Sequence, residues 1–162
     1  MKHTISVNFK NNFNALSRII GLFSGRGFNV DSVSFGEAKE PGTGRMTITT
    51  AGDELIIEQI IKQLDKIVDV ISVKDLTYEP FVERELALVK VASTSATRSE
   101  ITELVNVFRA KIIDISPVSL TIEVTGKEDK LNAAIGMLRP FGLLEVARTG
   151  SVALTREFKG ET

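Results

Sequence analysis

The chain has 162 residues, of which 43% are hydrophobic and 25% charged, and its formal net charge is −1 at pH 7. This balance indicates a folded globular protein, and the even division of charge between the two halves excludes the basic surface that nucleic-acid binding requires. No segment has the length of a membrane span, the N-terminus lacks the apolar core of a signal peptide and there is no cysteine, so we expect a cytoplasmic protein without membrane contacts, disulfides or thiolate chemistry.

Strand and helix patterns alternate along the N-terminal half. Apolar side chains at every second position predict strands over residues 5–9 and 46–50, and a third strand is predicted over residues 70–76. Apolar residues at helical spacing predict two helices between these strands. Their apolar faces are Leu16, Ile19, Ile20 and Phe23 in the first helix, and Ile57, Ile60, Ile61 and Leu64 in the second.

Local signals place the ends of these helices. The tripeptide Gly25-Arg26-Gly27 predicts a left-handed end for the first helix, because glycine adopts that conformation without strain. Asp53 and Glu54 put negative charge at the positive end of the second helix. Residues 36–44 predict a hairpin loop that is longer than the strand connection alone requires.

The C-terminal half repeats this order. Apolar residues at every second position predict two half-buried strands, one with Leu86 and Leu88 on its apolar face and one with Leu120, Ile122 and Val124. The segment Thr97-Arg98-Ser99-Glu100 has the form of a capping box, and Pro140 closes the last helix. The apolar faces of the two helices are Ile101, Leu104, Val105 and Phe108, and Leu131, Ala134, Ile135 and Leu138.

Each half therefore has the order β-α-β-β-α-β. This order predicts an α+β protein of two tandem ferredoxin-like domains, each an antiparallel sheet with both helices on one face. Proline at the join Tyr78-Glu79-Pro80-Phe81 interrupts the strand pattern and divides the chain into residues 1–78 and 79–162. A half of about eighty residues buries limited surface, and the other sheet face is left bare, so we expect a homodimer.

Few side chains have the pattern of a catalytic or metal centre. His3 is the only histidine, so we interpret it as a surface or strand-end residue without a metal or triad role. The carboxylate pairs Glu83/Glu85 and Glu128/Asp129 are interpreted as a solvated face or a helix first turn. The glycines form no phosphate-binding or dinucleotide-binding motif. We therefore expect a chain with no catalytic residue, no metal and no cofactor of its own.

The start of the first predicted helix is the most informative segment. Residues 11–18 leave a strand and enter this helix, where free backbone amides and the helix dipole favour a small carboxylate. Asn11 adds an amide side chain here, and Asn29 opens a later strand. An asparagine can bind both ends of an amino acid, since the ammonium group needs acceptors and the carboxylate needs donors. The alternative is that both asparagines only form turns.

Several segments of the chain resemble one known family. Residues 14–32, NALSRIIGLFSGRGFNVDS, resemble the opening of the ACT domain in acetolactate synthase (acetohydroxyacid synthase) small subunits. Further similarity to this family lies in residues 45–48, 63–70, 84–91 and 145–150, and it spans nearly the whole chain. The last two segments make the resemblance specific for this family, because an ACT opening alone would indicate only an amino-acid-sensing domain.

The resemblance implies a regulatory protein and not an enzyme. The N-terminal domain is then expected to be an ACT domain whose sheets join across a homodimer, with valine or a related amino acid bound between protomers. The expected partner is the catalytic large subunit, which would hold thiamine diphosphate, Mg²⁺ and FAD and condense pyruvate with pyruvate or 2-oxobutyrate. This chain would raise that activity and confer end-product inhibition in branched-chain amino acid biosynthesis.

The family pattern also implies which residues bind the effector. One protomer would contribute Asn11, Asn14, Ala15 and Leu16, and the other protomer Asn29 and Val30. The family usually has glycine at position 14, where this chain has asparagine. We expect the Asn14 side chain to cap the helix and compete with the effector carboxylate, or to crowd the pocket. Effector binding would then be weaker or altered in specificity, while activation of the partner survives.

Three other functions are compatible with the predicted fold. A free-standing ACT-domain amino-acid sensor would act on another enzyme or regulator. An acylphosphatase-like hydrolase would need an arginine in a phosphate-binding loop after the first strand, and residues 11–14 supply none. A module serving transcription or RNA would need exposed aromatic side chains in basic surroundings, whereas this chain has nine Phe, one Tyr and an acidic isoelectric point of about 5.9.

Overall fold

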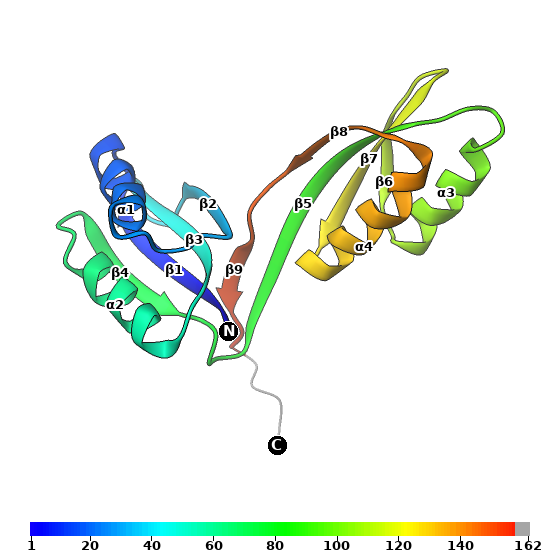
Figure 1. The fold of residues 1–162 in the computed structure, drawn as a ribbon. Coiled ribbons are helices and arrows are strands. Elements are labelled where there is room, and N and C mark those ends of the chain that lie inside the picture. The colour runs from blue at the N-terminus through cyan, green and yellow to red at the C-terminus, as the bar shows by residue number, and fades with distance from the viewer. Residues whose placement is uncertain (158–162) are drawn as a thin grey trace. The chain divides into compact units, whose positions relative to one another are not determined.

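The computed structural model describes residues 1–157, which form two compact units (Figure 1). The first unit comprises residues 1–83 and 150–157, and the second comprises residues 84–149. Each unit contains the predicted order βαββαβ, so the α+β class and the tandem ferredoxin-like architecture are confirmed. Within residues 1–157, no helix has the length and apolar character needed to cross a membrane.

The first unit is a four-stranded antiparallel sheet with two helices on one face. Its elements are β1 (Lys2–Lys10), α1 (Phe13–Arg26), β2 (Ser32–Glu37), β3 (Thr43–Ala51), α2 (Glu54–Asp65) and β4 (Val70–Asp75). The strands lie in the order β2-β3-β1-β4, so β2 and β4 form the edges. Ile5 lies opposite Ile48 and Val7 opposite Met46, and this register gathers the apolar side chains on the face that the helices cover.

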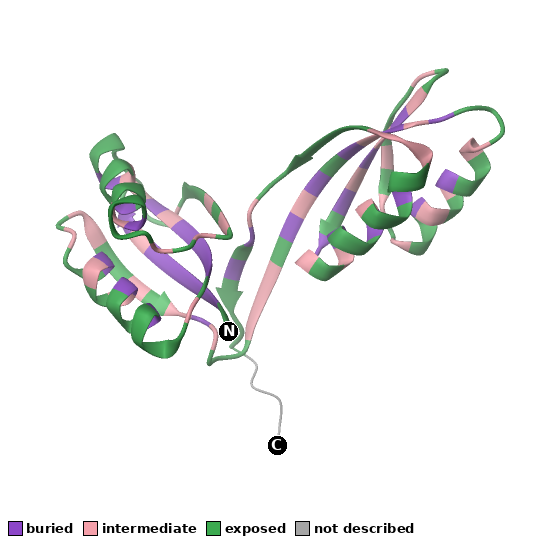
Figure 2. Ribbon diagram, in the orientation of Figure 1, coloured by how far each residue is buried: buried purple, intermediate pink, exposed green. Residues whose placement is uncertain are grey.

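The core of the first unit lies between the sheet and the two helices (Figure 2). It consists of Ile5, Val7, Phe9, Ala15, Ile19, Phe23, Met46, Ile48, Ile57, Ile60 and Leu64. The inward face of α1 differs from the prediction, because Ala15 is fully buried whereas Ile20 is 51% exposed. The buried positions of α1 are spaced four residues apart, so its apolar face is narrower than the sequence pattern indicates.

The second unit has the same plan. Its elements are β5 (Phe81–Ala92), which begins in the first unit, α3 (Arg98–Val107), β6 (Lys111–Ile115), β7 (Ser119–Gly126), α4 (Glu128–Leu138), the short 3-10 helix η1 (Arg139–Phe141) and β8 (Leu143–Arg148). The strands lie in the order β6-β7-β5-β8. The core consists of Ala87, Val89, Val91, Ile101, Val105, Leu120, Ile122, Val124, Leu131, Ala134 and Leu138.

The predicted inward face of β5 is wrong. Leu88 is 36% exposed, whereas Ala87 and Val89 on the other face are fully buried. Both faces of β5 carry aliphatic residues, Leu86 and Leu88 on one and Ala87, Val89 and Val91 on the other, so the alternation alone does not decide which face turns inward. The pairing with β7 decides it, because Val89 lies opposite the buried Ile122.

Three of the four predicted helix ends are confirmed, and one of these is the end of α4 at Leu138, two residues before Pro140. Gly27 ends α1 in the left-handed region, with φ of 64°. Asp53 caps α2, and its carboxylate accepts a hydrogen bond from the Ile56 amide at 2.9 Å. The capping box at α3 is not formed, because the Thr97 hydroxyl accepts a hydrogen bond from the Thr94 amide at 3.0 Å. Thr97 therefore stabilises the turn before α3 and not the helix itself.

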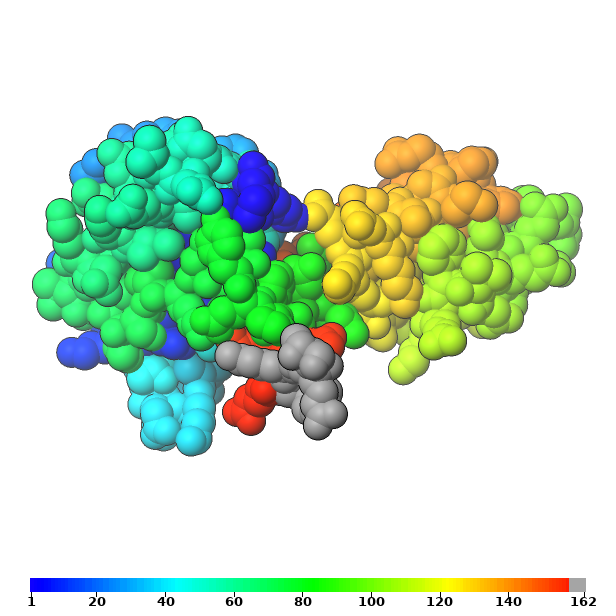
Figure 3. Space-filling view, turned by 90° about the horizontal axis from the view of Figure 1, so that it is seen from below, coloured from blue at the N-terminus to red at the C-terminus, as the bar shows by residue number. Residues whose placement is uncertain are grey.

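The β2–β3 hairpin is tighter than the prediction for residues 36–44. Glu37 pairs with Gly44, so only residues 38–42 connect the two strands. The connection protrudes from the first unit, as the cyan surface in Figure 3 shows. This connection of five residues is only two residues longer than the connection 116–118 between β6 and β7 of the second unit.

A short strand near the C-terminus, β9 (Val152–Thr155), was not predicted. It pairs with β5 and contacts β3, so residues 150–157 belong with the first unit, whereas the predicted boundary puts them in the second half, residues 79–162. Arg45 lies on the sheet face opposite the helices and donates a hydrogen bond to the Ala153 carbonyl oxygen at 2.9 Å. The C-terminal segment therefore covers part of the face that the sequence pattern left bare.

Candidate effector-binding site

The start of α1 is capped by Asn12. Its Oδ1 atom accepts a hydrogen bond from the Ala15 amide at 2.8 Å, and its carbonyl oxygen accepts one from the Leu16 amide at 3.3 Å. Asn14 is the second residue of the helix and its side chain is exposed, so the prediction that Asn14 caps the helix is wrong. Among the hydrogen bonds of the described chain, none is made by the amides of Phe13 or Asn14. Two donors therefore remain free at the positive end of the helix.

Backbone hydrogen bonds hold the turn that precedes α1. The Asn11 amide donates to the Gly42 carbonyl oxygen at 2.9 Å, and the Lys10 amide donates to the Asp69 carbonyl oxygen at 2.8 Å. These bonds join the turn to the β2–β3 hairpin and to the segment before β4. The Asn11 side chain itself is exposed, and the two free amides follow directly after this anchored turn.

Asn29 and Val30 lie in the loop between α1 and β2. The Thr50 hydroxyl donates to the Asn29 carbonyl oxygen, and the Asn29 side-chain amide donates to the Asp31 carboxylate at 3.3 Å. The Asp31 amide donates to the Thr49 carbonyl oxygen at 2.8 Å. Asn29 therefore has the turn-forming contacts of the alternative interpretation, but its side chain remains exposed and open to a ligand.

The six predicted effector residues fall into two groups that one protomer does not bring together. Asn11, Asn14, Ala15 and Leu16 lie at the start of α1, and Asn29 and Val30 lie just beyond its end (Figure 1). The helix has 14 residues. At a rise of 1.5 Å per residue, its two ends are about 21 Å apart. A small amino acid cannot span that distance, so a pocket with both groups requires two copies of the chain.

Edge strand β2 carries apolar side chains next to this loop. Val33 and Phe35 are 39% and 55% exposed. They lie opposite Ile48 and Met46 of β3, which places them on the helix-covered side of the sheet, beyond the part that the helices bury. An exposed apolar edge strand is a surface that pairs with another strand.

His3 is buried and is not a surface residue. Its side chain is 1% exposed, its Nδ1 atom lies 3.0 Å from Asp75 Oδ2, and its ring packs edge-on against Tyr78. His3 does lie at the end of β1, as one of the two predicted alternatives states. Among the described residues, no cluster of three or more His, Asp or Glu side chains is placed to hold a metal ion.

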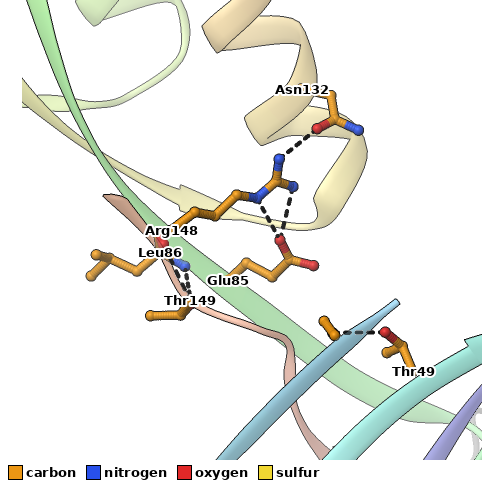
Figure 4. A network of polar contacts seen from close by, with 7 residues as sticks. Thr49, Glu85, Leu86, Asn132, Arg148 and Thr149 are labelled. Carbon is orange, nitrogen blue, oxygen red and sulfur yellow. Dashed lines mark hydrogen bonds and ion pairs between the residues drawn. The ribbon is translucent and has the colours of Figure 1, made fainter. Parts of the chain in front are cut away.

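The interpretation of Glu85 as part of a solvated face is also wrong. Glu85 is 8% exposed, and its Oε2 atom accepts hydrogen bonds from Arg148 Nε at 3.0 Å and Nη2 at 2.9 Å (Figure 4). Arg148 Nη1 donates to Asn132 of α4 at 2.7 Å. The pairing of β5 with β8 brings these distant residues together, and short-range patterns do not reveal it. Glu128 and Asp129 do lie in the first turn of α4, as predicted.

Comparison with known families gives two matches that together cover most of the chain. Residues 84–157 match the family model described as the small subunit of acetolactate synthase. Residues 5–72 match the model described as an ACT domain like that of the acetohydroxyacid synthase small subunit. The two matched regions correspond to the two halves that the sequence pattern predicts.

Individual relatives agree with these matches over nearly the whole chain. The acetolactate synthase small subunit of Aquifex aeolicus is 50% identical, over 96% of this chain and 82% of that protein. A probable acetolactate synthase small subunit of Archaeoglobus fulgidus is 48% identical, over 96% and 98% of the two chains. The crystal structure of the acetolactate synthase small subunit from Thermotoga maritima superposes with a TM-score of 0.90 at 40% identity, and the match covers 96% of this chain and 98% of that one.

Proposed function

The chain belongs to the family of acetolactate synthase small subunits, and on this premise we propose that it regulates a catalytic large subunit by binding an end-product amino acid, valine or a related one. The large subunit would hold thiamine diphosphate, Mg²⁺ and FAD and would condense pyruvate with pyruvate or 2-oxobutyrate in the cytoplasm. This chain would raise that activity and confer feedback inhibition in branched-chain amino acid biosynthesis.

The separation of the two candidate groups along α1 is the main support for an effector site between protomers. Closed dimers have two-fold symmetry, and a two-fold axis across the helix makes the two α1 helices antiparallel. The start of α1 in one protomer then lies beside the end of α1 in its partner. The exposed Val33 and Phe35 of β2, together with Ile20 of α1, provide apolar surface for that association.

Each part of an amino acid has a complementary group in such a site. The free amides of Phe13 and Asn14 would bind the carboxylate at the positive end of α1. The side-chain oxygen of Asn29 and the carboxylate of Asp31, from the partner, would accept hydrogen bonds from the ammonium group. Leu16 and Val30 are partly buried and would contact the aliphatic side chain.

Asn14 is expected to weaken effector binding because its side chain crowds the place of the carboxylate, and not because it caps the helix. Its exposed side chain stands beside its own free amide, where an effector carboxylate would bind. A glycine at this position would leave the amide accessible from all sides. We therefore retain the hypothesis that valine binds this chain more weakly, or with altered specificity, than it would bind a chain with glycine at position 14.

Regulation needs only a modest preference of the effector for one state of the complex. An effector that binds one arrangement of the dimer more tightly shifts the equilibrium toward it, typically by about 1–3 kcal/mol. A ligand held by both protomers fixes their relative orientation, so its occupancy can be transmitted to a bound catalytic subunit.

The direct test is acetolactate formation by the large subunit with and without this chain, titrated with valine, leucine and isoleucine. We expect the chain to raise the activity and at least one of the three amino acids to lower it. A chain that neither raises the activity nor confers inhibition would contradict the proposal. Co-purification distinguishes the alternative, because a free-standing amino-acid sensor would not retain a large thiamine-dependent subunit.

A further inference from the structure

The backbone at Gly150 is in direct contact with the backbone of β2. A Cβ atom on Gly150 would lie 2.7 Å from the Val33 carbonyl oxygen and 2.9 Å from its carbonyl carbon. Both are main-chain atoms, which cannot rotate away as a flexible side chain can. Any residue other than glycine would therefore push Gly150 and Val33 apart.

On one side, this contact continues into the candidate effector loop. Val33 lies only a few residues beyond Asn29 and Val30. The loop and the start of β2 are anchored to the same residue of β3, because Thr49 accepts a hydrogen bond from the Asp31 amide at 2.8 Å and its hydroxyl lies 2.7 Å from that of Ser32 (Figure 4). A shift of the loop upon effector binding would therefore move the β2 backbone with it.

The chain that leads into Gly150 from the second unit is held by hydrogen bonds up to Thr149. The Thr149 amide donates to the Leu86 carbonyl oxygen at 2.9 Å, and the Thr149 hydroxyl accepts from the Leu86 amide at 3.0 Å (Figure 4). Arg148, one residue earlier, is held by its two hydrogen bonds to Glu85. A displacement at Gly150 would thus reach bonded strands of the second unit and would not be absorbed by a loose loop.

Residues 150–155, which we name the C-terminal strap, are also held beyond Gly150. Ser151 and Ala153 are 2% and 4% exposed, and Arg45 donates its hydrogen bond to the Ala153 carbonyl oxygen. Thr47 and Thr49 lie on the same side of β3 as Arg45, opposite the core residues Met46 and Ile48, so β3 presents hydroxyl groups and not aliphatic side chains on this side. The strap is therefore held mainly by hydrogen bonds, through its pairing with β5 and through Arg45, and such a segment can shift at moderate cost in free energy.

We propose, on the basis of the proposed function, that the Gly150–Val33 contact is the point at which effector occupancy is transmitted from the loop at residues 29–31 to the chain that enters the second unit. The two states are the strap packed on Val33 and the strap shifted from it, and the effector would favour one of them. Gly150 is then a residue of signal transmission, and it does not contact the effector.

The test compares Gly150→Ala with the wild type in the full chain assembled with the large subunit. L-valine binding to the small-subunit dimer is measured by calorimetry, and inhibition of acetolactate formation is measured in the complex. We expect the dissociation constant to stay within about threefold of the wild type, while the valine concentration for half-maximal inhibition rises at least about tenfold or the inhibition is lost. Gly136→Ala is the matched control, because a Cβ atom there meets nothing within 4 Å.

The outcomes separate this inference from the proposed function. Unchanged inhibition in Gly150→Ala would overturn the inference, and so would loss of valine binding, since Gly150 would then belong to the effector site itself. Absence of valine binding in the wild type would instead contradict the proposed function. If Gly150→Ala does not fold, the same measurements are made on Arg45→Met, which removes the hydrogen bond that holds the strap at Ala153. Loss of inhibition with valine binding retained would support the inference. Retained inhibition in Arg45→Met would overturn the inference.

Discussion

The side-chain oxygen of Asn12 accepts a hydrogen bond from the amide of Ala15 at 2.8 Å, and this bond defines the start of α1. It satisfies one of the amides at the helix start and leaves those of Phe13 and Asn14 free. The donors available to a carboxylate therefore come from two consecutive residues.

Replacement of Asn12 should destabilise the protein. Asn12→Ala removes the helix cap, and we expect the free energy of unfolding to fall by about 1 kcal/mol. Urea unfolding measures this change. Asn11→Ala is the control, because the Asn11 side chain is exposed and only its backbone amide is bonded to Gly42. Equal losses in the two variants would show that Asn12 does not stabilise the helix start.

Replacement of Asn14 by glycine should strengthen effector binding. The change removes the exposed side chain beside the free amides, and we expect valine to bind Asn14→Gly at least about threefold more tightly, which corresponds to roughly 0.6 kcal/mol. Calorimetry with valine, leucine and isoleucine measures the change and any shift in specificity. Ser17→Gly is the control for the loss of helix propensity, since Ser17 is exposed one turn further along α1. Tight binding by the wild type with no gain in Asn14→Gly would contradict the hypothesis.

A charge on edge strand β2 should prevent association. Phe35 is 55% exposed at the edge where we propose that a second copy pairs, so Phe35→Asp should leave the chain monomeric under conditions in which the wild type forms the proposed dimer. Sedimentation equilibrium gives the oligomeric state, and valine binding should be lost in the same variant. Val68→Asp is the control, because Val68 is 81% exposed in the loop between α2 and β4. A Phe35→Asp variant that remains dimeric would exclude this edge as the interface.

Removal of one partner of the Glu85–Arg148 pair should lower the free energy of unfolding more than removal of both partners. Arg148→Met leaves the buried Glu85 carboxylate without its partner, and we expect a loss of about 2–3 kcal/mol in the free energy of unfolding. The double variant with Glu85→Leu should regain a large part of this loss. Lys90→Met, which breaks the exposed pair with Glu145, should cost less than about 1 kcal/mol. If Arg148→Met and Lys90→Met lowered the free energy of unfolding by similar amounts, the buried Glu85–Arg148 pair would contribute no more than an exposed one, which would contradict this prediction.

Tyr78 should ionise at a higher pH than free tyrosine. Desolvation first, and then the nearby Glu54 carboxylate, raise its pKa above 10.0. The unfolded chain then loses this proton first, so the stability from Tyr78 is present below about pH 10 and falls as the pH rises above it. Tyr78 is the only tyrosine and there is no tryptophan, so near-ultraviolet absorbance follows it alone. Glu54→Gln should lower the pKa, and an unchanged titration would exclude the influence of Glu54.

The sequence patterns predicted the order of elements because local periodicity determines it. The helix faces around Ile57 and Leu131 and the strand at Ile5 each follow from residues close together in the chain. The inward face of β5 was wrong because both of its faces carry aliphatic residues, and only the pairing with β7 decides between them. Strand β9 was missed because its four residues are held by partners more than sixty positions away.

Local sequence patterns were also insufficient to predict the detailed contacts of the candidate site. Asn11, Asn12 and Asn14 all stand within one turn of the helix start, and the sequence does not indicate which of them accepts the Ala15 amide. The burial of His3 was also not predictable from the sequence, because it depends on contacts with Asp75 and Tyr78, which lie more than seventy positions further along the chain. Tertiary contacts of this kind do not follow from local spacing.

The central claim is that each effector site takes the start of α1 from one protomer and the loop after α1 from its partner. Phe13→Pro removes a free amide at the first helical position, which tolerates proline, and Asn29→Ala removes the partner's acceptor. We expect each variant alone to lose valine binding. When the two variants are mixed, dissociated and reassociated, half of the dimers contain one chain of each variant. In such a dimer one site combines the intact helix start of the Asn29→Ala chain with the intact loop of the Phe13→Pro chain, and the other site carries both changes. Calorimetry should therefore detect valine binding at about a quarter of all sites. A mixture that binds no more valine than the separate variants would contradict the claim.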